Sequence, residues 1–160
     1  MATRKRKLAR AKPSWERGYY SHGYWRGKEK LGTLLKELQK TMTLHCGVFR
    51  NGPEIKEGLE KIRRIKNRFK RIGMSDSGML YNTELTAYLE LETLLDLAEV
   101  IAMGALARKE SRGAHSREDF PERDDVKWLK HTIARRSNGK VKLSYEPVKI
   151  TKFAPQARKY

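Results

Sequence analysis

The sequence predicts a mainly α fold: three helices followed by a small β-hairpin, with an extended basic arm at the N-terminus. Three observations support this prediction. Apolar residues recur every three or four positions in three segments between residues 31 and 111, which is the spacing of one helix face. A Ser-Asn-Gly-Lys stretch at 137–140 separates two strand-like segments. Residues 1–30 show neither pattern, as expected of an arm.

The first two helices have recognisable ends. One is expected over residues 31–46, with Gly47 as its stop, and the next over residues 53–72, followed by Gly73. Pro53 suits the first turn of the second helix, where a missing N–H costs nothing. In this second helix the apolar side chains form a coiled-coil-like seam made of Ile55, Gly58, Ile62, Ile65, Phe69 and Ile72.

The third helix is expected over residues 83–111, with Asn82 as its cap and Gly113 as its break. Its broad apolar face predicts that it is the central packing element. The side chains expected to be buried together are Ile62, Ile65, Phe69, Leu95, Ala98 and Ala102.

Two strands are expected over residues 128–134 and 140–146. Asn138 and Gly139 lie between them, and both tolerate the positive φ that a type I′ turn requires. Pro147 and the tail beyond it should be irregular. We therefore divide the chain into an arm (1–30), three helices with a charged loop (31–125), and a hairpin with a basic tail (126–160).

The net charge of +17 is unevenly distributed. Residues 1–30 carry ten Lys/Arg against two acids, and residues 126–160 carry ten against one, whereas residues 83–125 carry eleven acids against five Lys/Arg. The acidic segment could pack beside the basic second helix and neutralise it. It cannot neutralise both ends, so an anionic partner is expected.

Several protein classes are excluded. A single cysteine, Cys46, forbids an internal disulfide and a cysteine-rich zinc site, and it is expected to be a small core residue. No apolar run reaches membrane-spanning length, and no apolar signal core follows the basic start. We expect a cytoplasmic chain, or one peripheral to a membrane complex. Met1–Lys12 is unlike a linker, which favours a separately encoded chain over an excised fragment.

The arm interleaves cations with aromatic rings, a combination that suits RNA because cations neutralise phosphates and rings stack on bases. The alternatives, a solubilising leader or a protein-binding arm, stay open. The candidate nucleic-acid-binding residues are Arg4, Lys5, Arg6, Lys7, Arg10, Lys12, Trp15, Arg17, Tyr19, Tyr24, Trp25 and Arg26.

The most specific stretch is Ala107-Arg-Lys-Glu-Ser-Arg-Gly-Ala-His-Ser-Arg-Glu-Asp-Phe-Pro-Glu-Arg-Asp-Asp125, followed by Trp128-Leu-Lys-His-Thr132. It resembles the C-terminal domain of succinate dehydrogenase and fumarate reductase flavoprotein subunits. Gly47-Val-Phe-Arg50 and the ending Pro155-Gln-Ala-Arg-Lys-Tyr160 are similar to that family too. The resemblance covers roughly residues 31–160 and does not include residues 1–30.

The resemblance implies a three-helix, spectrin-like bundle and a small hairpin that pack against an FAD-binding domain, which this chain lacks. It also implies a structural role, with FAD reached only through a separate partner chain. The sequence has no Gly-x-Gly-x-x-Gly after a strand, so no dinucleotide cradle is expected. We expect no catalytic, cofactor-binding or metal-ligating residue: the four histidines fit no metal spacing, and His115 lacks a nucleophile nearby.

The charged loop alternates guanidinium and carboxylate groups, which can pair bidentately and fix an irregular backbone. An internal network of ion pairs and a docking surface are both possible, and the plainer alternative is a solvated loop of mixed charge. The candidate docking residues are Arg108, Arg112, His115, Arg117, Glu118, Asp119, Arg123, Asp124, Asp125 and Trp128.

Two functions remain. The first is a non-catalytic docking subunit of a succinate dehydrogenase/fumarate reductase-type complex, with a flavoprotein FAD domain and an iron–sulfur subunit as partners. The alternative is an RNA-binding, ribosome-associated protein built on a repurposed domain. Partner identity and oligomeric state are left open by the sequence.

Overall fold

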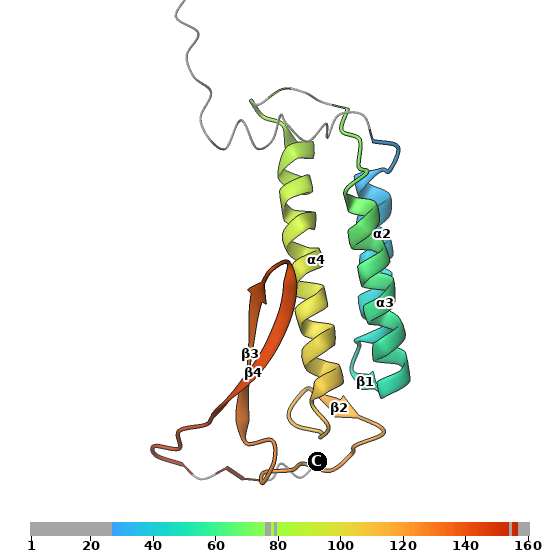
Figure 1. The fold of residues 1–160 in the computed structure, drawn as a ribbon. Helices are drawn as coiled ribbons and strands as arrows, with labels where there is room; N and C mark the ends of the chain where they lie inside the picture. Colours follow the sequence, from blue (N-terminus) through green and yellow to red (C-terminus); the bar gives the residue numbers. More distant parts are fainter. Residues whose placement is uncertain (1–26, 76–77, 79, 154, 157–160) are drawn as a thin grey trace, which may run out of the picture.

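The computed structural model describes residues 27–75, 78, 80–153 and 155–156. Within these ranges it contains three helices and two small sheets, as the sequence predicts (Figure 1). The elements in chain order are α2 (Leu31–His45), β1 (Phe49–Arg50), α3 (Gly52–Phe69), α4 (Thr83–Ala107), β2 (Ser116–Arg117), β3 (Lys130–Ser137) and β4 (Lys140–Pro147). The three helices lie side by side, and the β3–β4 hairpin runs along the C-terminal half of α4 (Figure 1).

Two helices begin at asparagine caps. The Asn51 side chain accepts a hydrogen bond of 2.9 Å from the Glu54 N–H in α3, and the Asn82 side chain accepts one of 2.8 Å from the Leu85 N–H in α4. Each cap satisfies an N–H that has no partner within its helix. The predicted starts of these helices are confirmed to within one residue.

The predicted ends of α3 and α4 were wrong. α3 ends at Phe69 rather than at residue 72, because Ile72 pairs in parallel with Glu29 instead of continuing the helix. The Glu29 N–H donates to the Arg71 carbonyl, and the Gly73 N–H donates to the Glu29 carbonyl, each at 3.1 Å. The bundle therefore begins before residue 31, and the arm cannot extend to residue 30 as predicted.

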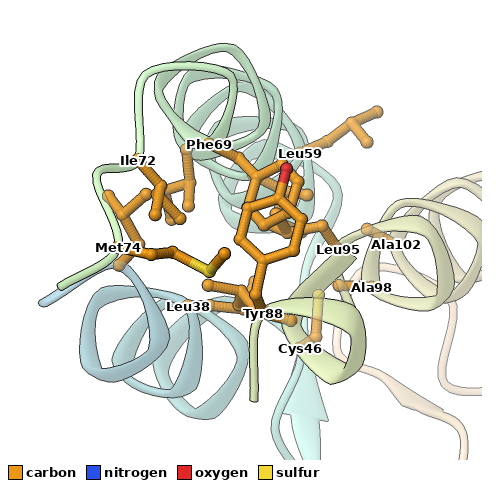
Figure 2. Packing of buried hydrophobic residues seen from close by; sticks show 14 residues of the cluster. Leu38, Cys46, Leu59, Phe69, Ile72, Met74, Tyr88, Leu95, Ala98 and Ala102 are labelled. Atoms are coloured by element: carbon orange, nitrogen blue, oxygen red, sulfur yellow. The ribbon is translucent and has the colours of Figure 1, made fainter. Parts of the chain in front are cut away.

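The core lies where the three helices meet, and Figure 2 shows their side chains pointing into one shared space. The Phe69 and Tyr88 rings stack at a centroid distance of 4.6 Å. All six side chains expected to be buried together are buried in one cluster, which confirms that prediction. Cys46 belongs to the same cluster, and burial raises the pKa of its thiol despite the opposing charge of Arg50.

The acidic third helix neutralises part of the basic second one, as the charge pattern suggested. Lys66 of α3 lies 2.6 Å from an Asp96 carboxylate oxygen and 2.7 Å from Glu99, and Arg63 lies 3.1 Å from Glu99. These ion pairs join α3 to α4 along the edge of the core.

The hairpin turn has the predicted geometry, with positive φ at Asn138 (50°) and Gly139 (73°). The strands are antiparallel, with Ser137 opposite Lys140, and they extend to residue 137 and to residue 147, beyond the predicted ends.

Within the described ranges, no helix is long and apolar enough to cross a lipid bilayer.

Candidate docking site

The charged loop, residues 108–128, is organised around Glu110, whose side chain is fully buried. Its two oxygens accept hydrogen bonds from Arg108 (2.5 Å), from both Nε and Nη2 of Arg112 (2.9 Å each) and from the Asp124 N–H (3.0 Å). Burial alone would raise the pKa of Glu110, but these donors together hold it below its ordinary value. The carboxylate therefore stays charged and holds two arginines in place.

Glu110 was not among the candidate residues from the sequence. The sequence feature that could have identified Glu110 is its position two residues after Arg108 and two residues before Arg112. What the sequence could not show is that both arginines turn inward to the same carboxylate.

Arg108 also ties the loop to the hairpin. It donates to the backbone carbonyls of Trp128 (2.9 Å) and Lys130 (2.8 Å), and to the Thr132 hydroxyl (3.2 Å). Its guanidinium lies 5.2 Å from the centre of the Trp128 ring, in the range of a cation–π contact. Trp128 itself precedes β3 rather than forming part of it, which corrects the predicted strand.

Arg117 explains why α4 ends at Ala107 and not at residue 111. It is 2% exposed and donates to the carbonyls of Ala105 (2.8 Å) and Arg108 (3.2 Å), which lack partners at a helix C-terminus. It also pairs bidentately with Asp119, at 2.7 Å for each bond. Asp119 in turn accepts a hydrogen bond of 3.0 Å from the Gly52 N–H, at the positive end of α3.

Because of these contacts, chiefly the Arg117 hydrogen bonds, the pKa of Asp119 falls to about 2. Arg117 and Asp119 thus join the C-terminus of α4 to the N-terminus of α3. β1 and β2 run in parallel beside them, with Phe49 opposite Ser116 and Arg50 opposite Arg117.

His115 lies between Arg50 and the end of α4. Its Nδ1 is 3.1 Å from an Arg50 nitrogen, and its Nε2 is 3.3 Å from the Arg108 carbonyl oxygen. Burial, supported by the nearby positive charges, lowers the pKa of His115. The neutral ring therefore accepts from Arg50 at Nδ1 and donates to the Arg108 carbonyl through Nε2.

The remaining candidate residues of the loop form its outer part. Arg123 pairs bidentately with Asp125 (2.8 and 2.6 Å) and donates to the Gln156 carbonyl (2.6 Å). Asp125 also pairs with Arg112. Asp124 accepts from two backbone N–H groups in a tight turn, and the Glu118 side chain is exposed. The loop is thus fixed by internal ion pairs, and the alternative of a solvated loop is wrong.

The candidate nucleic-acid-binding residues, Arg4 to Arg26, all lie outside the described residues. Their assignment stays a prediction.

Comparison with known proteins decides the family. The model of the family described as "Fumarate reductase flavoprotein C-term" matches residues 35–160. The chain belongs to this family. It is 42% identical to the fumarate reductase flavoprotein subunit of Mycobacterium tuberculosis over 146 residues, which are 91% of this chain and 25% of that protein. It is 43% identical to the corresponding subunit of Haemophilus influenzae over 135 residues, 84% of this chain and 22% of that protein.

A solved structure of Escherichia coli quinol fumarate reductase shares the fold, with a TM-score of 0.83 and 37% identity over 89% of this chain and 25% of that chain. The chain thus spans about a quarter of the length of the proteins it matches. The 146 residues matched in the M. tuberculosis protein exceed the 130 positions of residues 31–160, so the likeness extends into the arm, farther than the sequence motifs indicated.

The N-terminus of α3 does not fit the pyrophosphate of FAD. β1 is followed directly by α3, the arrangement that would present a helix N-terminus to a pyrophosphate. Here the Asn51 and Asp119 side-chain oxygens already accept hydrogen bonds from N–H groups of that first turn. A carboxylate at this position would repel a phosphate.

Proposed function

We propose that this chain is a non-catalytic, structural and docking part of a succinate dehydrogenase/fumarate reductase-type flavoprotein, at the periphery of a membrane complex. The supporting observation is that the charged loop is irregular yet tied to α3, α4 and the hairpin, while Gly113, Ala114, Glu118 and Val126 on its outer edge stay exposed. A surface that is rigid before binding loses less conformational entropy on association, which suits a docking element.

The proposal assigns FAD and an iron–sulfur cluster to partner chains. Purified alone, the chain should therefore be colourless and should bind neither FAD nor succinate. Absorbance spectroscopy and calorimetry test this directly. A flavin spectrum retained at equimolar level after gel filtration would contradict the proposal.

Docking is tested by co-expression. A flavoprotein chain shortened by the quarter that this domain matches, for example that of M. tuberculosis, is expressed with and without the 160-residue chain and an iron–sulfur subunit. We expect the tagged 160-residue chain to recover the flavoprotein with FAD. Glu118→Lys on the outer edge of the loop should weaken recovery, whereas Lys36→Glu, an exposed position in the N-terminal half of α2, serves as the control. Recovery of no flavoprotein chain would refute the docking role.

The second candidate, RNA binding, is favoured by the net charge of +17 and by the cationic, aromatic arm. It makes two separate predictions. Deleting residues 1–12 should weaken RNA binding and flatten its salt dependence by about 0.7–0.9 logarithmic unit for each lost phosphate contact. Trp25→Ala should weaken binding and leave the salt dependence unchanged, because stacking involves little charge. Equal RNA affinity of the unmodified chain, the deletion variant and Trp25→Ala across a salt series would exclude the arm as an RNA-binding element.

A further inference from the structure

A cavity of 340 Å³ lies where α3, α4 and the turn end of the hairpin meet. Figure 1 shows the turn of the hairpin reaching the middle of α4, where Arg136 of β3 pairs with Asp96. The floor of the cavity is apolar and consists of Phe69, Tyr88 and Leu95, which belong to the core of the bundle. Cavities of about 300–1,000 Å³ with an apolar lining and a few polar groups are typical of small-molecule sites.

The walls of this cavity carry an excess of positive charge. Three cations line it, Lys66, Lys70 and Arg136, and two carboxylates face them, Glu92 and Asp96. Burial by itself would lower the pKa of Lys66, but its bonds to Asp96 and Glu99 raise it, so the ammonium group stays charged. The charges of the walls therefore sum to +1.

The ion pairs beside the cavity are also one carboxylate short. Asp96 is shared by Arg136 and Lys66, the latter at 2.6 Å. Glu99 is shared by Lys66 at 2.7 Å and by Arg63 at 3.1 Å. Three cations thus divide two carboxylates between them.

Lys70, at the end of α3, adds a further cation to this wall. It is exposed and forms no ion pair with any residue that the structure describes. Glu92 is exposed as well and pairs with none of the described cations. A carboxylate that entered the cavity would meet Lys70 and the outer N–H groups of Arg136, which suit it because a guanidinium binds carboxylates in a defined geometry.

We propose that this cavity binds a small aromatic monocarboxylate, with its ring on the apolar floor and its carboxylate between Lys70 and Arg136. A single negative charge matches the excess of one cation, whereas a second would lie over the apolar floor or beside Asp96, which repels it. A ring suits the body of the ligand because ammonium and guanidinium groups are attracted to aromatic faces. The inference goes beyond the proposed function and does not depend on it, because the cavity contains no residue of the charged loop.

The test uses the 160-residue chain and 2-naphthoate as the probe, with naphthalene-2-carboxamide as its neutral counterpart of the same shape. In an NMR titration, 2-naphthoate should shift the signals of Tyr88, Leu95 and Arg136 with a Kd of about 1 mM, as expected for a ligand of about 13 non-hydrogen atoms. The carboxamide should bind about 10-fold more weakly, because it forms no ion pair with Lys70 or Arg136. Acetate, which has no ring, and succinate, which has two charges, should leave these signals in place.

Equal affinity for 2-naphthoate and the carboxamide would overturn the inference, since the cations would then recognise nothing. Shifts confined to residues outside the cavity would overturn it too.

Three substitutions on the walls should change the affinity with opposite signs. Arg136→Gln and Lys70→Gln should each weaken 2-naphthoate binding about 3-fold, because partly exposed ion pairs contribute modestly. Glu92→Gln removes a carboxylate that repels the ligand and should strengthen binding about 2-fold. Damage to the fold cannot produce this gain, so the signs separate recognition of charge from loss of structure.

Arg135→Gln is the matched control, because Arg135 precedes Arg136 in β3, is equally exposed and points to the opposite face of the hairpin. It should bind 2-naphthoate as the unmodified chain does. If Arg136→Gln loosens the hairpin, Lys70→Gln on α3 and Glu92→Gln on α4 decide the outcome. Unchanged affinity in these two variants would overturn the inference and leave the proposed function to its own co-expression test.

Discussion

The helical bundle and the charged loop are stabilised by different physical means. In the bundle, fourteen buried side chains form one apolar cluster, and burial of apolar surface is non-directional. In the loop, buried Glu110 and Arg117 hold the backbone through charge-assisted hydrogen bonds that require defined angles. The bundle should therefore tolerate changes of similar volume, whereas the loop should be sensitive to the loss of a single charge.

The comparison of the bundle with the loop also separates the residues that determine the fold from those expected to determine the function. An apolar core can form with many sequences of the right pattern and volume. A loop in which each arginine has a specific carboxylate or carbonyl partner presents one particular surface. This contrast is the reason to expect docking at the loop end of the molecule, and it can be tested residue by residue.

The largest effect is expected at the centre of the loop. Glu110→Ala leaves Arg108 and Arg112 without their buried partner and should cost about 3–5 kcal/mol in the free energy of unfolding. Urea titration measures it, and Glu118→Ala, an exposed glutamate of the same loop, is the control, expected within about 0.5 kcal/mol of wild type. A loss below about 1 kcal/mol for Glu110→Ala would mean that the ion pairs do not hold the loop.

The bundle should respond to lost volume. Ile62 is fully buried, and Ile62→Ala should cost about 2–5 kcal/mol through lost apolar contact and the remaining cavity. Ile101→Ala removes the same atoms from a side chain that is 49% exposed, so it should cost distinctly less. Equal losses for the two variants, measured by thermal or urea unfolding, would be inconsistent with the core described here.

Acid should weaken the loop contacts before the apolar core. The pKa of Asp119 is about 2 in the folded chain, against an ordinary 3.8, so its contribution to stability is complete above pH 3.8 and is lost as the pH falls toward 2. Asp119→Asn should therefore lose less stability than wild type between pH 4 and pH 2. Ile62→Ala should keep the wild-type pH dependence. Parallel pH profiles for Asp119→Asn and wild type would show that this carboxylate is not held as described.

The smallest effect on stability is expected in the hairpin, where the charged side chains are exposed to solvent. Arg135 lies directly opposite Lys142 across the two strands, and both side chains are exposed. Lys142→Glu replaces a repulsive cross-strand pair with an attractive one and should stabilise the fold by roughly 0.2–1 kcal/mol at low salt. The gain should fade at high salt, and Lys140→Glu, opposite Ser137, is the control.

The sequence predicted well where structure follows from local chemistry. Asn51 and Asn82 cap helices because their short side chains reach the N–H groups of the next turn. Its larger failures are at contacts between residues from separate parts of the chain, whereas the misplaced ends of the two strands are local. These contacts are the pairing of Glu29 with Ile72, the hydrogen bonds from Arg117 to the carbonyls at the end of α4, and the approach of Arg50 to His115. The residues that they join lie far apart in the chain or in an irregular loop.

The sequence by itself therefore determined three helices, a hairpin with positive φ at Asn138 and Gly139, and the family to which the chain belongs. Periodicity, capping and turn chemistry act over a few residues, so a linear pattern is enough to reveal them. The tertiary structure decided which charges are buried, since a loop with alternating signs allows many pairings. It alone selected Glu110 and Arg117 as the buried members, left Arg50 without an ion pair to any carboxylate of the described residues, and exposed Leu94, Leu97 and Ile101, because burial depends on which elements pack together in space.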